Sequence, residues 1–173
     1  ATSALLILYL YLQNKQIFTD TLTSLLNRQE FNKMINMEIT DKKEFVVFVI
    51  SLRDFKFIND KFGQDVGDKI LLQVCAYLKS LLPKQLLYRY GGDEFLVLMK
   101  YQQLDAIKQK INAIQNSLAK CCTLQGNENV YISIGVATAP MHGMNLQVLY
   151  EKADKALYRA KLNGKNQYYI YAE

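Results

Sequence analysis

Two adjacent acids follow two adjacent glycines near the middle of this sequence, and these acids are well placed to do chemistry. The stretch Gly91-Gly92-Asp93-Glu94 separates two short apolar runs, Leu86–Tyr90 and Phe95–Met99, and paired glycines admit the positive φ angles of a hairpin turn. Asp and Glu are poor strand formers and are rarely buried without a partner. Mg²⁺ prefers one or two carboxylates together with water and substrate phosphates, so the pattern predicts a site for a nucleoside triphosphate. The plain alternative is a solvated turn that carries two acids.

The segments around this turn predict a sheet covered by helices. Phe45–Leu52 is a continuous apolar, β-branched run, which is typical of a fully buried strand. Two helices follow, a short one near Phe55–Lys61 and a longer one after Gly63 and Gly67 that ends at Pro83. Periodicity also predicts a turn over 20–27, helices over 31–39, 104–118 and 146–160, and strands over 130–137 and 168–171. This order indicates an α/β or α+β domain.

The first 19 residues are expected to form a separate helix. Leu5, Leu8 and Leu12 fall on one helical face, which predicts a helix over residues 3–18. The apolar stretch Ala4–Leu12 is shorter than the roughly 20 residues of a membrane-spanning helix, and it lacks the features of a signal peptide. We expect either the inner end of a membrane helix or the start of a linker helix. Residues 20–173 then form a single domain.

Composition excludes several classes of protein. The chain has 173 residues, 50% of them hydrophobic and 21% charged, which excludes disorder and collagen. Its net charge of +5 suits a polyphosphate or a nucleic acid partner. Three cysteines and the single histidine, His142, make no plausible zinc set and indicate a reducing, cytosolic compartment. A P-loop is absent, and so is the aromatic strand of a sheet-based RNA-binding domain, so we expect no nucleic acid partner.

In the segment around Gly91-Gly92-Asp93-Glu94, the chain resembles the GGDEF family, the diguanylate cyclases that condense two GTP molecules into cyclic di-GMP. Arg89–Phe95 contains the complete signature of the family, and the likeness covers about residues 20–171 in order. Ser24 stands where a glycine is usual. The other matching blocks are Asp20–Thr23 with Leu25, Asn27 and Arg28; Phe55-Lys56, Ile58–Asp60, Phe62-Gly63 and Gly67-Asp68; Ser133–Val136; and Ala153-Asp154, Tyr158, Ala160-Lys161 and Gly164–Asn166.

The resemblance implies a palm-like fold, with a ferredoxin-like or nucleotidyl-cyclase-like central sheet, surrounding helices and a glycine β-hairpin. It also implies GTP as substrate, Mg²⁺ or Mn²⁺ as cofactor, a homodimer in which two domains face each other, and further signalling domains at either end. The location would be cytoplasmic, with a tether to the inner face of the membrane through the segment before residue 1 as one option. The implied catalytic acids are Asp93, which also binds the metal, and Glu94. The implied substrate-binding residues are Asn59 and Asp68 at the guanine edge, Gly91 and Gly92 beneath the nucleotide, the backbone of Asp54 and Phe55 at the phosphates, and the phosphate-facing lysines Lys56, Lys161 and Lys165.

Four of the implied roles have a plainer alternative. Lys161 and Lys165 would simply be solvated on the polar side of the last helix. Asn59 would cap or bond a turn, and Asp68 would be the N-cap or first-turn acid of the following helix.

The pattern of the family breaks at the metal site. Active members end the strand before the Phe-Lys pair in Asp-x-Asp, and here these positions are Ser51 and Arg53. A serine ligates magnesium weakly, so Ser51 is a degenerate metal position, and phosphoryl transfer depends on charge neutralisation by metal. Asp54 is the only nearby acid, and its odd offset from Ser51 should turn it away. The expected function is a GTP-binding regulatory or dimerisation module with weak or absent catalysis; the alternative is an active diguanylate cyclase. Leu82–Gln85 also replaces the Arg-x-x-Asp inhibitory site, so product inhibition there is not expected.

Overall fold

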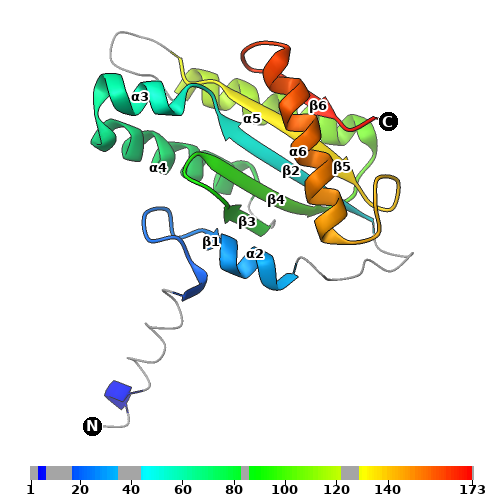
Figure 1. Ribbon diagram of the computed structural model, residues 1–173, viewed down its shortest axis with the longest axis horizontal. Coiled ribbons are helices and arrows are strands. Elements are labelled where there is room, and N and C mark those ends of the chain that lie inside the picture. The colour runs from blue at the N-terminus through cyan, green and yellow to red at the C-terminus, as the bar shows by residue number, and fades with distance from the viewer. Residues whose placement is uncertain (1–3, 7–16, 35–43, 83–85, 122–128, 173) are drawn as a thin grey trace.

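The computed structural model describes residues 4–6, 17–34, 44–82, 86–121 and 129–172. In these ranges one six-stranded sheet lies between two layers of helices (Figure 1). The strands are β1 (Leu26–Asn27), β2 (Phe45–Leu52), β3 (Leu86–Arg89), β4 (Glu94–Lys100), β5 (Ile132–Thr138) and β6 (Tyr168–Ile170). The helices are α2 (Arg28–Met34), α3 (Phe55–Phe62), α4 (Gln64–Leu81), α5 (Leu104–Cys121) and α6 (Leu146–Leu162).

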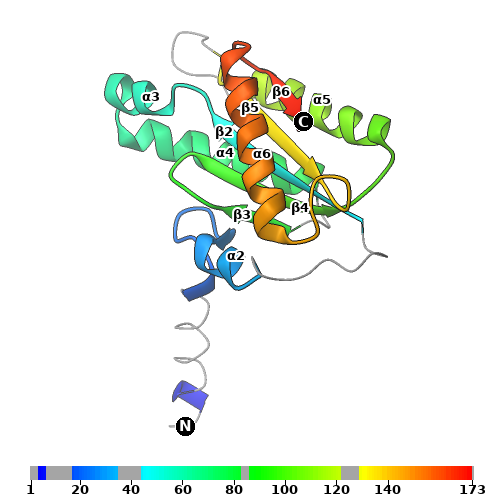
Figure 2. The same cartoon turned by 45° about the vertical axis from the view of Figure 1, so that its right-hand side comes forward.

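The sheet has the strand order β1-β3-β4-β2-β5-β6. Strand β2 lies inside the sheet and pairs antiparallel with both β4 and β5. The two edge strands are short and pair in parallel, β1 with β3 and β6 with β5. In Figure 2, β3 lies on the side of the sheet next to α2, and β5 and β6 lie on the opposite side. The C-terminal end of β2 therefore lies between β4 and β5.

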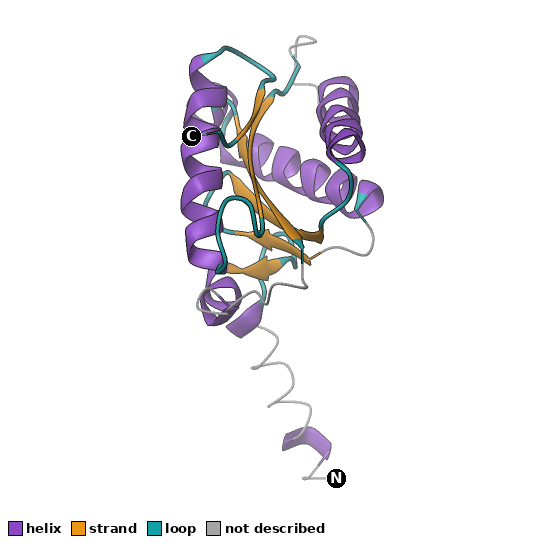
Figure 3. Ribbon diagram, turned by 90° about the vertical axis from the view of Figure 1, so that its right-hand side faces the viewer, coloured by secondary structure: helices purple, strands orange, loops and turns teal. Residues whose placement is uncertain are grey.

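Each face of the sheet packs against its own set of helices. Helices α3, α4 and α5 cover one face, while α2 and α6 cover the other (Figure 3). In β2, Phe48 and Ile50 belong to the first core, whereas Val47 and Val49 belong to the second. A strand buried on both faces needs apolar side chains at every position, which explains the unbroken apolar run. Because side chains alternate along a strand, Ser51 faces the side of α6.

The predicted α/β fold class is confirmed, and β2 has the predicted bounds. The expected turn over 20–27 is partly wrong, because Leu26–Asn27 forms β1. The longer helix begins at Gln64 and so includes Gly67, whereas Pro83 lies outside the described residues. Of the helix expected over 3–18, only residues 4–6 and 17–18 are described, and both pieces are helical. Among the described helices, none combines the length and the hydropathy needed to cross a membrane.

Candidate functional site

The β3–β4 hairpin presents the glycine turn at one end of the sheet. The backbone N–H of Tyr90 donates to the carbonyl of Glu94 at 2.8 Å, which closes the turn. Positive φ angles among the described glycines occur at Gly63 and Gly164 only, so the hairpin is confirmed but its expected reliance on positive φ is wrong. A Cβ added to Gly92 would meet nothing within 4 Å. Gly92 thus leaves open space beside the turn, whereas a Cβ on Gly91 would contact the side chain of Glu94 at 3.7 Å.

An arginine joins this hairpin to the turn that precedes β1. One Arg89 guanidinium nitrogen donates to the carbonyl of Gly92 at 2.8 Å, and another lies 3.0 Å from Asp20 Oδ1. The same carboxyl oxygen accepts from the backbone N–H and the hydroxyl of Thr23, at 2.8 and 2.7 Å. Burial alone would raise the pKa of Asp20, but these hydrogen bonds and Arg89 together lower it below its ordinary value. The ionised carboxylate therefore holds the turn and the hairpin together.

The end of β2 holds Ser51 beside Asp93. The N–H of Leu52 donates to the carbonyl of Asp93 at 3.1 Å, and the N–H of Arg53 donates to the carbonyl of Tyr131 at 2.8 Å. These bonds fix the strand end between its two neighbours. The buried Ser51 hydroxyl donates to Asp93 Oδ2 at 3.4 Å, a long hydrogen bond. The predicted metal position and the predicted metal acid therefore lie side by side.

Glu94 lies half-buried on the α6 face among charges of both signs. Burial is the largest influence and raises the pKa of its carboxyl above the ordinary value. Lys161 and Arg28 oppose this rise, while Asp93 and Asp154 add to it. Arg28 and Asp154 belong to blocks that matched the family, yet no role followed from their spacing. Only the packing of α2 and α6 on the same face brings them to Glu94.

Arg53 extends from the strand end toward the end of α6. Its Nη1 donates to the carbonyl of Lys161 at 3.4 Å, whereas its Nε is buried and has no partner among the described residues. Strand β2 ends at Leu52, so the alternation that should have turned Asp54 away does not reach it. Asp54 instead adopts a left-handed conformation with φ 56°, is exposed, and precedes α3 without capping it through its side chain.

Asn59, one of the two expected guanine-reading residues, lies where α3 packs against α4 at Gly67. The amide oxygen Oδ1 of Asn59 is buried and has no partner among the described residues. A Cβ on Gly67 would collide with this oxygen and would lie 3.2 Å from the ring of Phe55, so only glycine fits there. Asp68 follows Gly67 and is exposed. The alternative that Asp68 caps α4 or lies in its first turn is wrong, because α4 begins at Gln64 and Asp65 is its first-turn acid.

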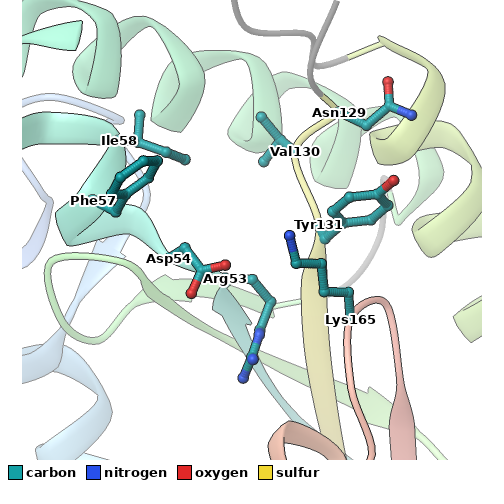
Figure 4. Close-up of a pocket in the computed structure, with 8 residues that line it drawn as sticks. All are labelled: Arg53, Asp54, Phe57, Ile58, Asn129, Val130, Tyr131 and Lys165. Carbon is teal, nitrogen blue, oxygen red and sulfur yellow. The ribbon is translucent and has the colours of Figure 1, made fainter. Parts of the chain in front are cut away.

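The three lysines that were expected to face the phosphates differ in exposure and in neighbours. Lys56 is exposed in the first turn of α3. Lys161 is partly buried in the last turn of α6. Lys165 lies beyond α6, which ends at Leu162, so its expected place on the last helix is wrong. It is exposed, and its Nζ lies 5.8 Å from the centre of the Tyr131 ring. Lys165 and Arg53 line one small pocket of about 80 Å³ between the start of α3 and the start of β5 (Figure 4).

The donor set fits a tightly bound divalent cation poorly. The described residues contain no group of three or more His, Cys, Asp or Glu side chains that would hold a metal ion. Asp93 offers one carboxylate, and one of its oxygens already accepts from Ser51. Arg53, at the second acidic position of the family, brings a positive charge to the strand end. A Mg²⁺ ion at this place would therefore meet the carboxylate of Asp93, the neutral hydroxyl of Ser51 and the competing positive charge of Arg53.

This palm-like α/β fold, with its glycine hairpin and the cluster beside it, is that of a nucleotidyl-cyclase-like domain. Residues 17–167 match the family described as "Diguanylate cyclase, GGDEF domain". The chain belongs to the GGDEF family.

Relatives carry different names. The chain is 37% identical over 155 residues to "Cyclic di-GMP phosphodiesterase PdeB" of Shewanella oneidensis, which covers 88% of this chain and 18% of that protein. It is 31% identical over 161 residues to "Diguanylate cyclase DgcP" of Pseudomonas aeruginosa, which covers 90% of this chain and 24% of that protein. The chain thus spans about a fifth to a quarter of these two relatives.

A solved structure shares the fold. The coiled coil and GGDEF domain of DgcB from Caulobacter crescentus, in complex with c-di-GMP, superimposes with a TM-score of 0.84 at 23% identity. The match covers 98% of this chain and 94% of that chain. At this level of identity the likeness confirms the fold, including the predicted palm-like sheet.

Proposed function

We propose that the chain is a GTP-binding GGDEF domain of cyclic di-GMP signalling in which catalysis is weak or absent. In this proposal the domain acts as a regulatory or dimerisation module of a larger protein. A relative named as a cyclase and a relative named as a phosphodiesterase both carry a matching domain, so the names of the relatives do not decide the activity of this chain.

Guanine recognition is supported by the geometry of α3 and α4. The unpartnered Asn59 Oδ1 is an acceptor in need of a donor, and an exposed carboxylate, Asp68, lies on the adjoining helix. The Watson–Crick edge of guanine carries two N–H donors, which an amide oxygen and a carboxylate can accept. Leaving a buried acceptor without a partner costs roughly 1–3 kcal/mol, which a bound base would recover.

Phosphate binding follows from the charges around the hairpin. In the proposal Lys56, Lys161 and Lys165 offset the charge of the triphosphate, and the backbone of Asp54 and Phe55 donates to it. Gly92 supplies open space beside the turn that a nucleotide needs, and Gly91 would lie beneath the nucleotide with it. Asp93 keeps the role of metal-binding and catalytic acid, and Glu94 keeps the role of catalytic acid. Ser51, beside Asp93, would be a weak metal ligand.

The proposal that catalysis is weak or absent rests on the contact between Ser51 and Asp93. Where the family places two acids around the metal, this chain places one acid, a hydroxyl 3.4 Å away and the guanidinium of Arg53. Mg²⁺ or Mn²⁺, when bound, would supply charge neutralisation for phosphoryl transfer. Binding the triphosphate without this stabilisation of the transition state does not raise the chemical rate.

An active diguanylate cyclase is the second candidate. The proximity of Asp93, Glu94 and Lys161 favours it, since the acids of the hairpin retain a cationic neighbour on α6.

Incubation with GTP and Mg²⁺ or Mn²⁺, followed by chromatography for cyclic di-GMP, tests the two candidates. We expect little or no product from the unmodified chain and at least tenfold more from Ser51→Asp with Arg53→Asp, because the metal-binding acid at position 51 returns and the positive charge at position 53 is removed. Asp93→Asn in the same background should abolish the gain. Robust synthesis by the unmodified chain would overturn the proposal and favour the second candidate.

The larger assembly is also proposed. Two copies would face each other as a homodimer, and other signalling domains would lie at either end of the full protein. Residues 1–19 would form the linker helix or the inner end of a membrane helix ahead of the domain at 20–173, which would place the domain in the cytoplasm, with or without a membrane tether.

A further inference from the structure

Arg53 is the charged group that the proposed function leaves without a task. Its guanidinium has five N–H donors, and the described residues satisfy one of them, through the 3.4 Å contact with the Lys161 carbonyl. Its Nε is buried and unpartnered. No carboxylate pairs with it among the described ion pairs. Arg53 as a whole is partly buried, and its buried Nε is a donor that an acceptor at this place would satisfy.

The surroundings of Arg53 suit a phosphate group. Arg53 lines the small pocket with Lys165, Tyr131 and the start of α3. Figure 4 shows Lys165 reaching toward the space between α3 and β5, whereas the guanidinium of Arg53 points away from this space, toward the end of α6. Helix α3 begins there without a side-chain cap, so its first N–H groups are available to an anion. Asp54 contributes one opposing negative charge to the same pocket. Lys165 offsets this charge in the pocket, and the guanidinium of Arg53 adds a positive charge on the side that faces α6.

We propose that Arg53 replaces the divalent cation in this domain, so that the chain binds the triphosphate of GTP without a metal ion. This inference rests on the proposed function, because it assigns the phosphate-binding half of the same site. Compared with Asp-x-Asp, the pair Ser51 and Arg53 makes the strand end more positive by three charges, from −2 to +1. The guanidinium fork matches phosphate oxygens in geometry as well as in charge.

A structural role for Arg53 is the competing explanation. A cation at the C-terminal end of a helix interacts favourably with the helix dipole, and Arg53 does contact the last turn of α6. A structural arginine would matter equally whether or not metal is present. An arginine that stands in for the metal would matter most when metal is removed.

Isothermal titration of the full chain with GTP, in excess EDTA and in Mg²⁺, separates these explanations. We expect the unmodified chain to bind GTP in EDTA within about tenfold of its affinity in Mg²⁺. Arg53→Gln keeps a donor for the Lys161 carbonyl but loses the charge; it should bind GTP at least tenfold more weakly in EDTA and lose less in Mg²⁺. Ser51→Asp with Arg53→Asp should reverse the dependence, with binding in Mg²⁺ only.

A control variant and a second ligand distinguish failure of this inference from failure of the proposed function. Arg159→Gln removes the same charge from an exposed part of α6, where Arg159 bonds to the Tyr169 hydroxyl, and should leave binding in EDTA unchanged. Binding of GTP by the unmodified chain in Mg²⁺ only, or an equal loss for Arg53→Gln in both conditions, would overturn the inference and leave the proposed function standing. Inorganic triphosphate, which lacks the base, tests the reverse: if it binds in EDTA while GTP binds no better than ATP, the guanine assignment fails and the inference stands.

Discussion

Glu94 lies half-buried beside the turn, and burial raises its pKa. A carboxyl with a raised pKa binds its proton more tightly in the folded state than in the unfolded state, where the ordinary value is 4.5. Stability from this group is therefore complete below pH 4.5 and is lost as the pH rises through the folded pKa. At neutral pH the ionised side chain opposes folding.

Glu94→Gln should accordingly stabilise the chain at pH 7. We expect the melting temperature to rise by about 1–2 °C, a modest gain because the side chain keeps access to water. The gain should vanish near pH 3.5, where the unmodified carboxyl is protonated in both states. Differential scanning calorimetry at the two pH values measures this, and an equal gain at both would contradict the electrostatic explanation.

Ser24 shows why the family usually has glycine at its position. Its φ angle is 56°, in the left-handed region, and its N–H donates to the carbonyl of Asp20 at 2.8 Å. A side chain in this region costs roughly 1–2 kcal/mol compared with the right-handed region, and glycine avoids the cost.

Ser24→Gly should therefore raise the free energy of unfolding by about 0.5–1 kcal/mol in urea titrations. Ser80→Gly is the matched control, since Ser80 is exposed near the end of α4 and glycine there should destabilise the helix by about 0.5 kcal/mol. Destabilisation by both substitutions would show that the Ser24 side chain makes a stabilising contact that outweighs its backbone conformation.

Among the elements, β5 and α6 approach each other most closely at Gly135. A Cβ at this position would collide with the carbonyl of Ala153 and the backbone of Leu157. Because both neighbours are helix backbone, relief requires movement of the whole of α6, which carries Lys161 and Asp154 to the site.

Gly135→Ala should reduce the free energy of unfolding by about 1–3 kcal/mol or more, as overpacked cores do. Gly92→Ala provides the control, because its Cβ meets open space and stability should change by less than about 0.5 kcal/mol. Urea unfolding of the two variants compares them directly. Equal stability of Gly135→Ala and the unmodified chain would mean that α6 shifts without cost.

The elements that sequence predicted well are those with a strong local pattern. The apolar run of β2 and the periodic faces of α4, α5 and α6 are properties of the segments themselves. Strand β1 was missed because two residues carry no period and are held by pairing with β3. The contact of Arg53 with Lys161, the charges around Glu94 and the unpartnered oxygen of Asn59 arise between distant segments, so no local pattern announces them.

At the scale of the whole molecule, the described residues near the start of the chain, 4–6 and 17–18, include exposed apolar side chains. Leu5 and Leu6 expose 66% and 58% of their surface, and Ile17 exposes 47%. Large apolar side chains exposed in one segment usually mark an interface.

We predict that residues 3–18 mediate self-association. A chain that begins at Lys15 should sediment as a smaller species than the full chain in analytical ultracentrifugation at equal concentration. Leu5→Glu places a charge on the expected helical face of Leu5, Leu8 and Leu12, so the full chain with this substitution should also sediment as a smaller species. An unchanged oligomeric state for both would refute this prediction.

The sheet ends in a two-residue strand on one side and a three-residue strand on the other. Unpaired strand edges are templates on which further chains can add, and long exposed edges lead to aggregation. Within the described residues these edge strands present few backbone groups, so they offer little to an incoming strand. If copies of the domain assemble as proposed, we therefore expect them to meet through loops and helices and to form no continuous sheet.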